Sequence, residues 1–167
     1  MVMSQLGPIQ SMAQGSYEEK VRILIVEDDD DLRMLMAFHL RMCGYAVIEF
    51  RDGEALLDYI GNLMKRGTDR SKHADMVLLD INLPGFSGLQ VLTSLRRAQL
   101  GNPIIMMTGQ RRDAEGEAFR LGATALVRKP FDIEEVVKMI DRVKSHTARA
   151  VTNDDASGTY QLQPFCM

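Results

Sequence analysis

The segment Asp75-Met-Val-Leu-Leu-Asp-Ile-Asn-Leu-Pro-Gly-Phe-Ser-Gly88 is an apolar run that ends in an acid and passes into a turn-rich loop. A short apolar run of this kind predicts a buried β-strand. Asp is a poor strand former, and a buried carboxylate needs a partner. Asp80 is therefore either the residue that starts the turn or part of a site. Ser87 fits as the N-cap of a helix that follows the loop.

The alternation of apolar strand and amphipathic helix continues on both sides of this segment. We predict strands at 21–26, 45–50, 75–80, 103–108 and 124–128, and helices at 31–43, 53–65, 87–98, 112–121 and 132–146. In the first helix, the spacing expected of an inward face is shared by Leu32, Leu35, Met36, His39, Leu40 and Cys43. Strands that alternate with helices, without hairpin signals, predict an α/β fold with a doubly wound five-stranded parallel sheet and helices on both faces.

The bulk properties fit one ordinary domain with tails, because the chain has 167 residues. We expect a flexible leader at 1–19, a folded domain at 20–148 and a flexible C-terminal tail at 149–167 without an effector domain. A net charge of −3 gives no reason to expect a nucleic-acid footprint. The cysteines at 43 and 166 lie far apart, which argues against a disulfide scaffold and suits a reducing cytosol. No apolar run is long enough to span a bilayer.

Polar residues follow the ends of the predicted strands, apart from the second strand, which ends in Glu49-Phe50. They are Glu27 and Asp28, Asp80, Thr108 and Lys129. Because ligands of such sheets bind beyond the carboxyl ends of the strands, we expect these side chains to meet.

The acids among them, Glu27, Asp28 and Asp80, would repel one another at short range. Their convergence makes physical sense if a hard cation sits among them, and Mg²⁺ prefers such oxygen ligands. Acids after a strand also cap the next helix and suit its positive end. That second interpretation is the one we adopt for 29–31, and it stays open for Asp28.

Lys129 and Thr108 complete the predicted site. Pro130 biases Lys129 away from helical geometry, and the long side chain can then reach Asp80. The ordinary alternative for Lys129 is a solvated lysine between strand and helix. Thr108 ends an apolar strand with its hydroxyl facing the same crevice, unless it is there only for its β propensity. Gly109 leaves room for a group to approach.

Taken together, these residues resemble the receiver domain of two-component response regulators. The matching stretches are Ile25-Val-Glu-Asp-Asp29, Leu78-Leu-Asp-Ile-Asn-Leu-Pro-Gly-Phe-Ser-Gly88, Met107-Thr-Gly109 and Lys129-Pro-Phe131. The resemblance covers about Val21 to His146. It implies a flavodoxin-like sheet with strand order 2-1-3-4-5 and a receiver domain over 20–148.

The resemblance also implies a role for each residue. Asp80 would be the phospho-acceptor, assisted by Thr108 and Lys129, which would contact the phosphoryl group. Mg²⁺ or Mn²⁺ would be the cofactor. Its ligands would be Glu27, Asp28, Asp80 and the backbone carbonyl of Asn82.

The implied protein is a cytoplasmic signalling domain rather than an enzyme that turns over a separate substrate. Its phosphodonor would be a sensor histidine kinase or a histidine phosphotransfer protein, and its output a conformational change read by a downstream target protein. Neither nucleic acid nor membrane is an expected direct partner. A homodimer through the face of the fourth helix, fifth strand and fifth helix is an option that such relatives use.

Three individual residues and one loop bear on how this chain would work. Leu126 stands where the family usually has Tyr or Phe, which puts an aromatic rotamer switch in doubt. Asn82 and Gln110 occupy the positions that tune hydrolysis of the phosphoryl group; both are neutral, so they could position a water but not deprotonate one. The loop 67–73 is long and basic, and a solvated loop explains it better than a docking site.

Three other functions were weighed against this one. A receiver that no longer accepts phosphate could serve as a docking adaptor. A phosphatase of the haloacid dehalogenase type also uses Asp, Mg²⁺ and Lys, but it needs an Asp-x-Asp pair after the first strand. A DNA-binding regulator needs more residues after His146 than the tail supplies.

Overall fold

A computed structural model of the chain describes residues 20–66, 74–109, 112–152 and 165–166. The sheet is parallel and contains β1 (Arg22–Val26), β2 (Ala46–Phe50), β3 (Met76–Asp80), β4 (Ile104–Thr108), β5 (Ala125–Arg128) and β6 (Phe165–Cys166). Its order is β2-β1-β3-β4-β5-β6. The predicted fold class and the order 2-1-3-4-5 are therefore confirmed, with one added strand at the β5 end.

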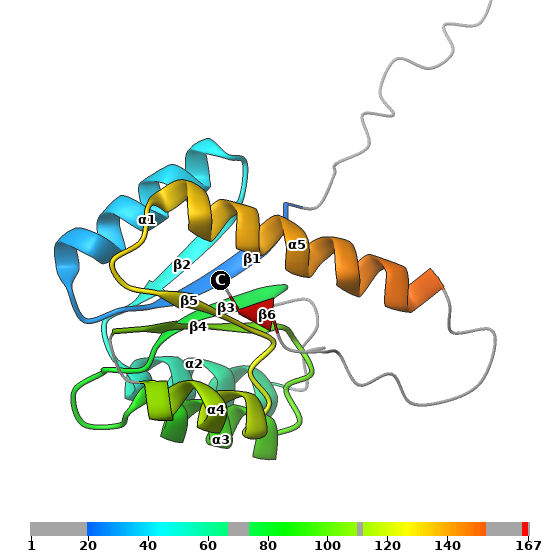
Figure 1. The fold of residues 1–167 in the computed structure, drawn as a ribbon. Helices are drawn as coiled ribbons and strands as arrows, with labels where there is room; N and C mark the ends of the chain where they lie inside the picture. The colour runs from blue at the N-terminus through cyan, green and yellow to red at the C-terminus, as the bar shows by residue number, and fades with distance from the viewer. Residues whose placement is uncertain (1–19, 67–73, 110–111, 153–164, 167) are drawn as a thin grey trace, which may run out of the picture.

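Five helices cover the sheet: α1 (Asp30–Met42), α2 (Gly53–Lys65), α3 (Gly88–Arg97), α4 (Arg112–Arg120) and α5 (Ile133–Thr152). Figure 1 shows α1 and α5 on one face of the sheet and α2, α3 and α4 on the other. Within the described residues, no helix combines the length and apolar character needed to cross a membrane.

Two apolar layers, one on each face, hold the helices to the sheet. Side chains of a strand alternate between faces, so neighbouring residues join different layers. Leu24 packs with α2, α3 and α4, whereas Ile25 packs with α1 and α5. Every residue of β3 and β4 is buried, as expected for central strands of a doubly wound sheet.

The helix caps follow the sequence signals. The Asp29 carboxylate accepts a hydrogen bond from the Leu32 N–H at 3.0 Å and caps α1, which confirms the capping role predicted for this acid. At α3, Ser87 and Gln90 form a reciprocal capping box. These caps fix where each helix starts relative to the strand before it, and so fix the geometry of the strand ends.

α4 packs on the sheet through small side chains. Among its described side chains, the buried ones are Ala114 and Ala118. An ion pair adds to this contact, because Arg128 of β5 reaches the Glu115 carboxylate with two nitrogen atoms, each 2.6 Å from an oxygen. The buried side chains described in α4 are thus smaller than those of α2 and α3, while Phe119 packs partly buried against the same layer.

The structure differs from the sequence prediction at three places. α5 continues to Thr152, past the boundary predicted at residue 148. The predicted tail contributes β6, which no strand signal had indicated. Leu35 and Cys43, expected on the inward face, are exposed, whereas Met36 and Leu40 of the same expected set are buried together with Ala37. The predicted leader 1–19, the loop 67–73 and Gln110 lie outside the described residues.

Candidate functional site

The carboxyl ends of β1, β3 and β5 bring three charged side chains into direct contact. The Lys129 ammonium lies 2.7 Å from a carboxylate oxygen of Glu27 and 2.7 Å from one of Asp80. Glu27 and Asp80 are 1% and 2% exposed, so both acids are buried. Residues that are 49 and 102 positions from Lys129 in the chain thus meet at one point because parallel strands end at one edge of the sheet.

Asp28 adds a third carboxylate from the solvent side. One carboxylate oxygen from each of Glu27, Asp28 and Asp80 lies within 4.8 Å of the others, although Asp28 itself is exposed. Three oxygen donors at this spacing, with one side open to solvent, fit a hard divalent cation that keeps several waters. The donor set therefore fits the predicted metal, and this acidic pocket could bind a divalent cation.

The electrostatics reflect burial opposed by charge pairing. Burial raises the pKa of the Glu27 carboxyl above its ordinary value; the hydrogen bond from Lys129 opposes this rise and the charge of Asp80 adds to it. Burial alone would lower the pKa of the Lys129 ammonium, but its hydrogen bonds to Asp80 and Glu27 outweigh burial, and that pKa is raised. The ammonium is therefore firmly charged, and it compensates the two buried acids.

The backbone around Asp80 orients its carboxylate. The Asn82 N–H donates to the second oxygen of Asp80 at 3.1 Å. Gly88 lies so close that a Cβ there would sit 2.0 Å from the Asp80 carbonyl oxygen. Only glycine permits this approach, which seats the start of α3 directly against the end of β3. One Asp80 oxygen is thus held by Lys129 and the other by a backbone amide.

Thr108 lies buried at the end of β4, one residue beyond Met107, which pairs with Asp80. Its hydroxyl donates to the Gly109 carbonyl at 2.9 Å, and its own carbonyl accepts from the Lys129 N–H at 2.6 Å. A Cβ on Gly109 would come 3.4 Å from the side-chain nitrogen of Asn82. The ends of β3, β4 and β5 are thus joined through short polar contacts.

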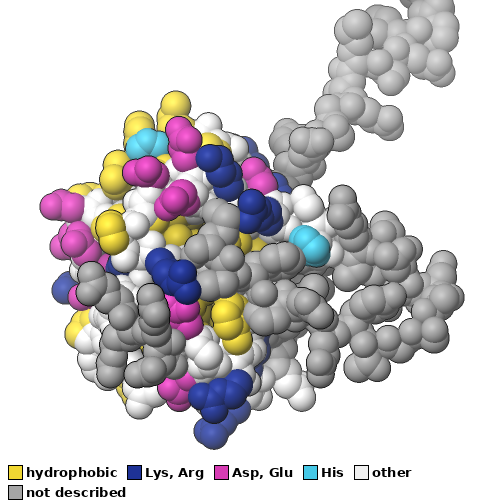
Figure 2. All heavy atoms as spheres, in the orientation of Figure 1, with side chains coloured by type: hydrophobic (Ala, Val, Ile, Leu, Met, Phe, Trp, Pro, Cys, Tyr) yellow, Lys and Arg dark blue, Asp and Glu magenta, His cyan; other side chains and the backbone are white. Residues whose placement is uncertain are grey.

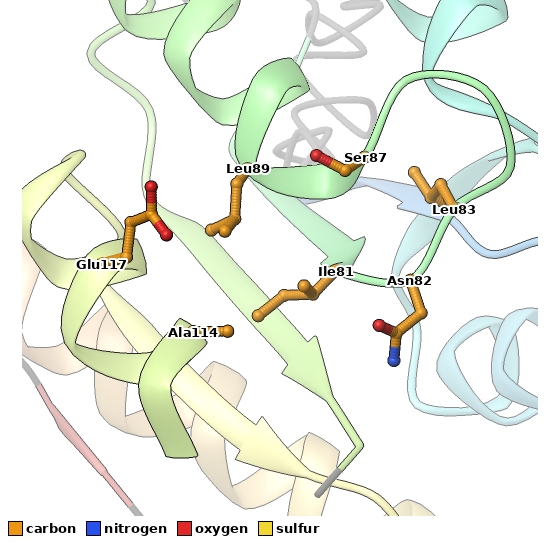
Figure 3. A pocket seen from close by; sticks show the side chains of 7 residues that line it. All are labelled: Ile81, Asn82, Leu83, Ser87, Leu89, Ala114 and Glu117. Atoms are coloured by element: carbon orange, nitrogen blue, oxygen red, sulfur yellow. The ribbon is translucent and has the colours of Figure 1, made fainter. Parts of the chain in front are cut away.

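A cavity of about 450 Å³ opens beside this site, between α4 and the loop that follows β3. Figure 3 shows Asn82 on the loop side and Ala114 and Glu117 reaching from α4. Its lining residues are Ile81, Asn82, Leu83, Ser87, Leu89, Ala114 and Glu117. Asn82 therefore lies between the acid cluster, which it contacts through its hydrogen bond to Asp80, and the cavity that α4 lines on its other side.

The predicted site residues therefore form a connected group. Glu27, Asp28, Asp80 and Lys129 are in one cluster, with the Asn82 backbone against Asp80 and Thr108 linked through the Lys129 backbone. The sequence did not indicate that Lys129 pairs with Glu27 as closely as with Asp80. The position of Glu27 directly after an apolar strand is the signal that could have indicated it.

Leu126, at the position where the family usually has an aromatic residue, is fully buried in the layer shared with α2, α3 and α4. An aliphatic side chain in this place cannot perform a rotation between a buried and an exposed aromatic rotamer.

The sequence matches the response regulator receiver domain family over residues 23–141. The DNA-binding transcriptional regulator NtrC of Klebsiella pneumoniae is 33% identical over 123 residues, which make up 73% of this chain and 24% of NtrC. The cell cycle transcriptional regulator CtrA of Caulobacter vibrioides is 30% identical over 142 residues, 81% of this chain and 57% of CtrA. The chain thus spans less than two thirds of the length of these relatives.

Solved structures agree in fold. A CheY-like response regulator receiver domain protein from Methanospirillum hungatei superimposes with a TM-score of 0.67 at 23% identity, covering 78% of this chain and 98% of that one. The chemotaxis response regulator CheY4 of Vibrio cholerae gives a TM-score of 0.60 at 26% identity, covering 74% of this chain and 98% of that one.

Proposed function

This chain belongs to the response regulator receiver domain family, and on that basis we propose that it accepts a phosphoryl group on Asp80 and signals by a change of conformation. The observation that carries the proposal is the contact of the Lys129 ammonium with two buried carboxylates, 2.7 Å from each. A purely structural ion pair needs one acid, and the second buried acid makes sense when a cation and a phosphoryl group share the site.

The proposed reaction is a transfer between two protein side chains. A carboxylate oxygen of Asp80 attacks the phosphorus of a phosphohistidine on the donor, the P–N bond breaks, and the P–O bond of an acyl phosphate forms. The histidine leaves with the electron pair of the broken bond. Lys129, already within hydrogen-bond distance of Asp80, is placed to pair with a phosphoryl oxygen, and the Asn82 N–H holds the oxygen that does not attack.

We propose Mg²⁺ as the cofactor, with Mn²⁺ able to take its place. Glu27, Asp28 and Asp80 would hold it, with the backbone carbonyl of Asn82 as a further ligand. When bound, the ion supplies positive charge that offsets the repulsion among the acids and the negative charge of the phosphoryl oxygens. Asn82, which is neutral, would position the water that later hydrolyses the acyl phosphate without deprotonating it.

Helix α1 offers a surface for the phosphodonor next to the acid cluster. Four of the large hydrophobic side chains exposed in the described part of the chain belong to α1, with exposures of 47 to 73%: Met34, Leu35, Phe38 and Met42. Positions separated by three, four, seven and eight residues share one side of a helix, so the four form a stripe. Figure 2 shows hydrophobic side chains gathered where α1 lies in Figure 1.

We propose that this stripe receives a helix of a sensor histidine kinase or histidine phosphotransfer protein, because an apolar stripe on one helix suits packing against another. α1 starts two residues after Asp28, so a helix bound there lies beside the acids. The output would be a shift of α4 and β5 read by a downstream target protein, or a homodimer through α4, β5 and α5.

The same proposal includes a cytoplasmic location and a signalling role without turnover of a separate substrate. A phosphorylation-independent adaptor is less favoured, because a docking function alone gives no reason to bury two acids against one ammonium. The Asp80→Asn variant described next separates the two functions.

Acetyl phosphate with Mg²⁺, followed by mass spectrometry of the intact protein, tests the proposal. The wild-type chain should gain the mass of one phosphoryl group, and Asp80→Asn should not. Asp58→Asn, which removes an exposed acid of α2, is the matched control and should be modified like wild type. An unmodified wild-type protein would favour the adaptor, and modification of Asp80→Asn would place the acceptor elsewhere. Steady release of phosphate from generic phosphomonoesters would favour a phosphatase.

A further inference from the structure

The C-terminal segment of the chain pairs with the end strand of its own sheet. Phe165 and Cys166 form β6, which runs parallel to β5 with Phe165 opposite Ala125 and Cys166 opposite Leu126. Figure 1 shows this short red strand beside β5, between α5 on one face of the sheet and α4 on the other. It thus occupies the sheet edge within the face that we propose for output.

The backbone of β5 needs a partner at that edge. On its other side β5 pairs with β4, and the Thr124 N–H donates to the Ile104 carbonyl at 2.8 Å. Alternate residues of a strand direct their backbone groups to opposite neighbours. The backbone groups of Ala125 and Val127 therefore point away from β4, toward the position of β6. Both residues are buried, and buried N–H and C=O groups need partners.

The two ends of the sheet differ in this respect. The first four residues of β2 are half-buried, and its Glu49 pairs with Arg41 of α1 at 2.8 Å. Partial exposure and charge are ordinary protections of an edge strand. Three of the four residues of β5 are buried and apolar, so this edge is protected by covering rather than by charge.

We propose that residues 165–166 are a built-in, displaceable occupant of the β5 edge, and that a partner engages this edge with an extended segment that pairs through its backbone. Such strand addition is an established mode of peptide recognition. Because β6 belongs to the same chain as β5, it binds the edge with a high effective concentration. Its two residues form few ladder bonds, however, so a longer partner strand can displace it. A bound partner and the own strand then exclude each other, and each weakens the binding of the other.

The inference does not depend on phosphorylation of Asp80, and its test uses the unmodified chain. The double variant Phe165→Pro/Cys166→Pro removes both backbone N–H groups of β6, because proline has none, and so breaks the bonds that β6 donates to β5. Without them β6 should leave the edge, and the amides of Ala125 and Val127 then lose their acceptors on β6. Ser157→Pro is the matched control, since it places a proline in the same C-terminal region without touching β6. Amide hydrogen exchange of Ala125 and Val127, followed by NMR, reports the state of the β5 edge.

We expect the exchange of these two amides to become roughly tenfold faster in the double variant and to stay unchanged in Ser157→Pro, since a tenfold change is about what one backbone hydrogen bond contributes to a local opening equilibrium. In the same samples, the amides of Leu24 and Leu78 in the central strands should not change. Equal exchange of Ala125 and Val127 in all three proteins would overturn the inference.

A labelled peptide with the sequence of residues 160–167 tests the vacated edge as a binding site, with fluorescence anisotropy as the readout. It should bind the double variant at least tenfold more tightly than it binds wild type or Ser157→Pro, in which the edge is already filled. Equal binding to all three proteins, or binding to none of them, would show that the edge is not a competitive strand-addition site.

Discussion

Replacing Lys129 by Met should reveal how strongly the acid cluster depends on one ammonium. At 2.7 Å and an effective dielectric constant near 20, each ammonium–carboxylate contact is worth about 6 kcal/mol of gross Coulomb attraction. Two carboxylate oxygens within 4.8 Å of each other repel by about 3 kcal/mol or more in the same medium. Lys129→Met removes the attraction and leaves the repulsion between Glu27 and Asp80.

The net loss is smaller than these gross values, because water and relaxation screen the acids. Removing one partner of a buried ion pair costs about 3–5 kcal/mol. The Lys129 side chain is 23% exposed, so water can partly replace it, and we expect a loss of about 3 kcal/mol. Urea unfolding at pH 8 in metal-free buffer measures it. The control is Lys138→Met, whose exposed pair with Glu134 at 3.9 Å should cost under about 0.5 kcal/mol.

Two conditions should reduce the loss. Mg²⁺ should restore part of the stability, because it supplies positive charge among the acids. Acid should also restore it: burial raises the pKa of the Glu27 carboxyl above its ordinary value, and loss of the ammonium raises it further. The folded variant then binds a proton that the unfolded chain releases, so its stability rises as pH falls through the raised pKa. A Lys129→Met protein as stable as wild type at pH 8, or a loss unaffected by both Mg²⁺ and pH, would refute this reasoning.

Three further measurements test other parts of the structure. Arg96→Ala should lower the unfolding free energy, measured by urea unfolding, by about 2 kcal/mol, because the Arg96 guanidinium donates to the carbonyls of three separate loop residues. A loss no larger than that of the exposed Arg97→Ala would contradict this role. Burial raises the pKa of Tyr45 to about 12, so the folded state keeps its phenol proton at a pH where the unfolded chain has lost it. Wild type should therefore lose stability from about pH 10 to 12, and Tyr45→Phe should lose less over the same range. Identical alkaline unfolding of the two proteins would exclude this. Mg²⁺ affinity measured by calorimetry should fall as pH drops through the raised pKa of Glu27, since protons compete with the cation. An affinity that does not change between pH 8 and pH 5 would argue against Glu27 as a ligand.

The sequence predicted the acid cluster well because a parallel sheet brings its strand ends together. Asp80 and Lys129 are 49 residues apart, yet each follows a short apolar strand, and the strand pattern alone places them at one edge. The start of α1 was predicted equally well, because Asp29 is a capping residue whose preference is local.

The remaining features depend on packing that a local pattern does not encode. Leu35 was assigned to the inward face from its spacing, but the face that is buried is centred on Met36, Ala37 and Leu40, and a helical wheel cannot tell which edge of a broad apolar face is buried. β6 lies in the short amphipathic end that was assigned to the flexible tail, because a two-residue strand draws its stability from the edge it pairs with and leaves little signal in its own sequence. The double contact of Lys129 likewise depends on the tertiary placement of Glu27.

The packing of α4 bears on how easily this helix could move relative to the sheet. The buried side chains described in α4 are the small Ala114 and Ala118, with Phe119 packed partly buried against the same layer, so a slide of this helix would disturb less fully buried hydrocarbon than a slide of α3. The heavier side chains of α3 next to it, such as Leu92 and Leu95, stay fixed in the interior. A chemical change at the rim of the sheet would therefore meet less resistance in moving α4 than in moving a helix that is packed through large buried side chains.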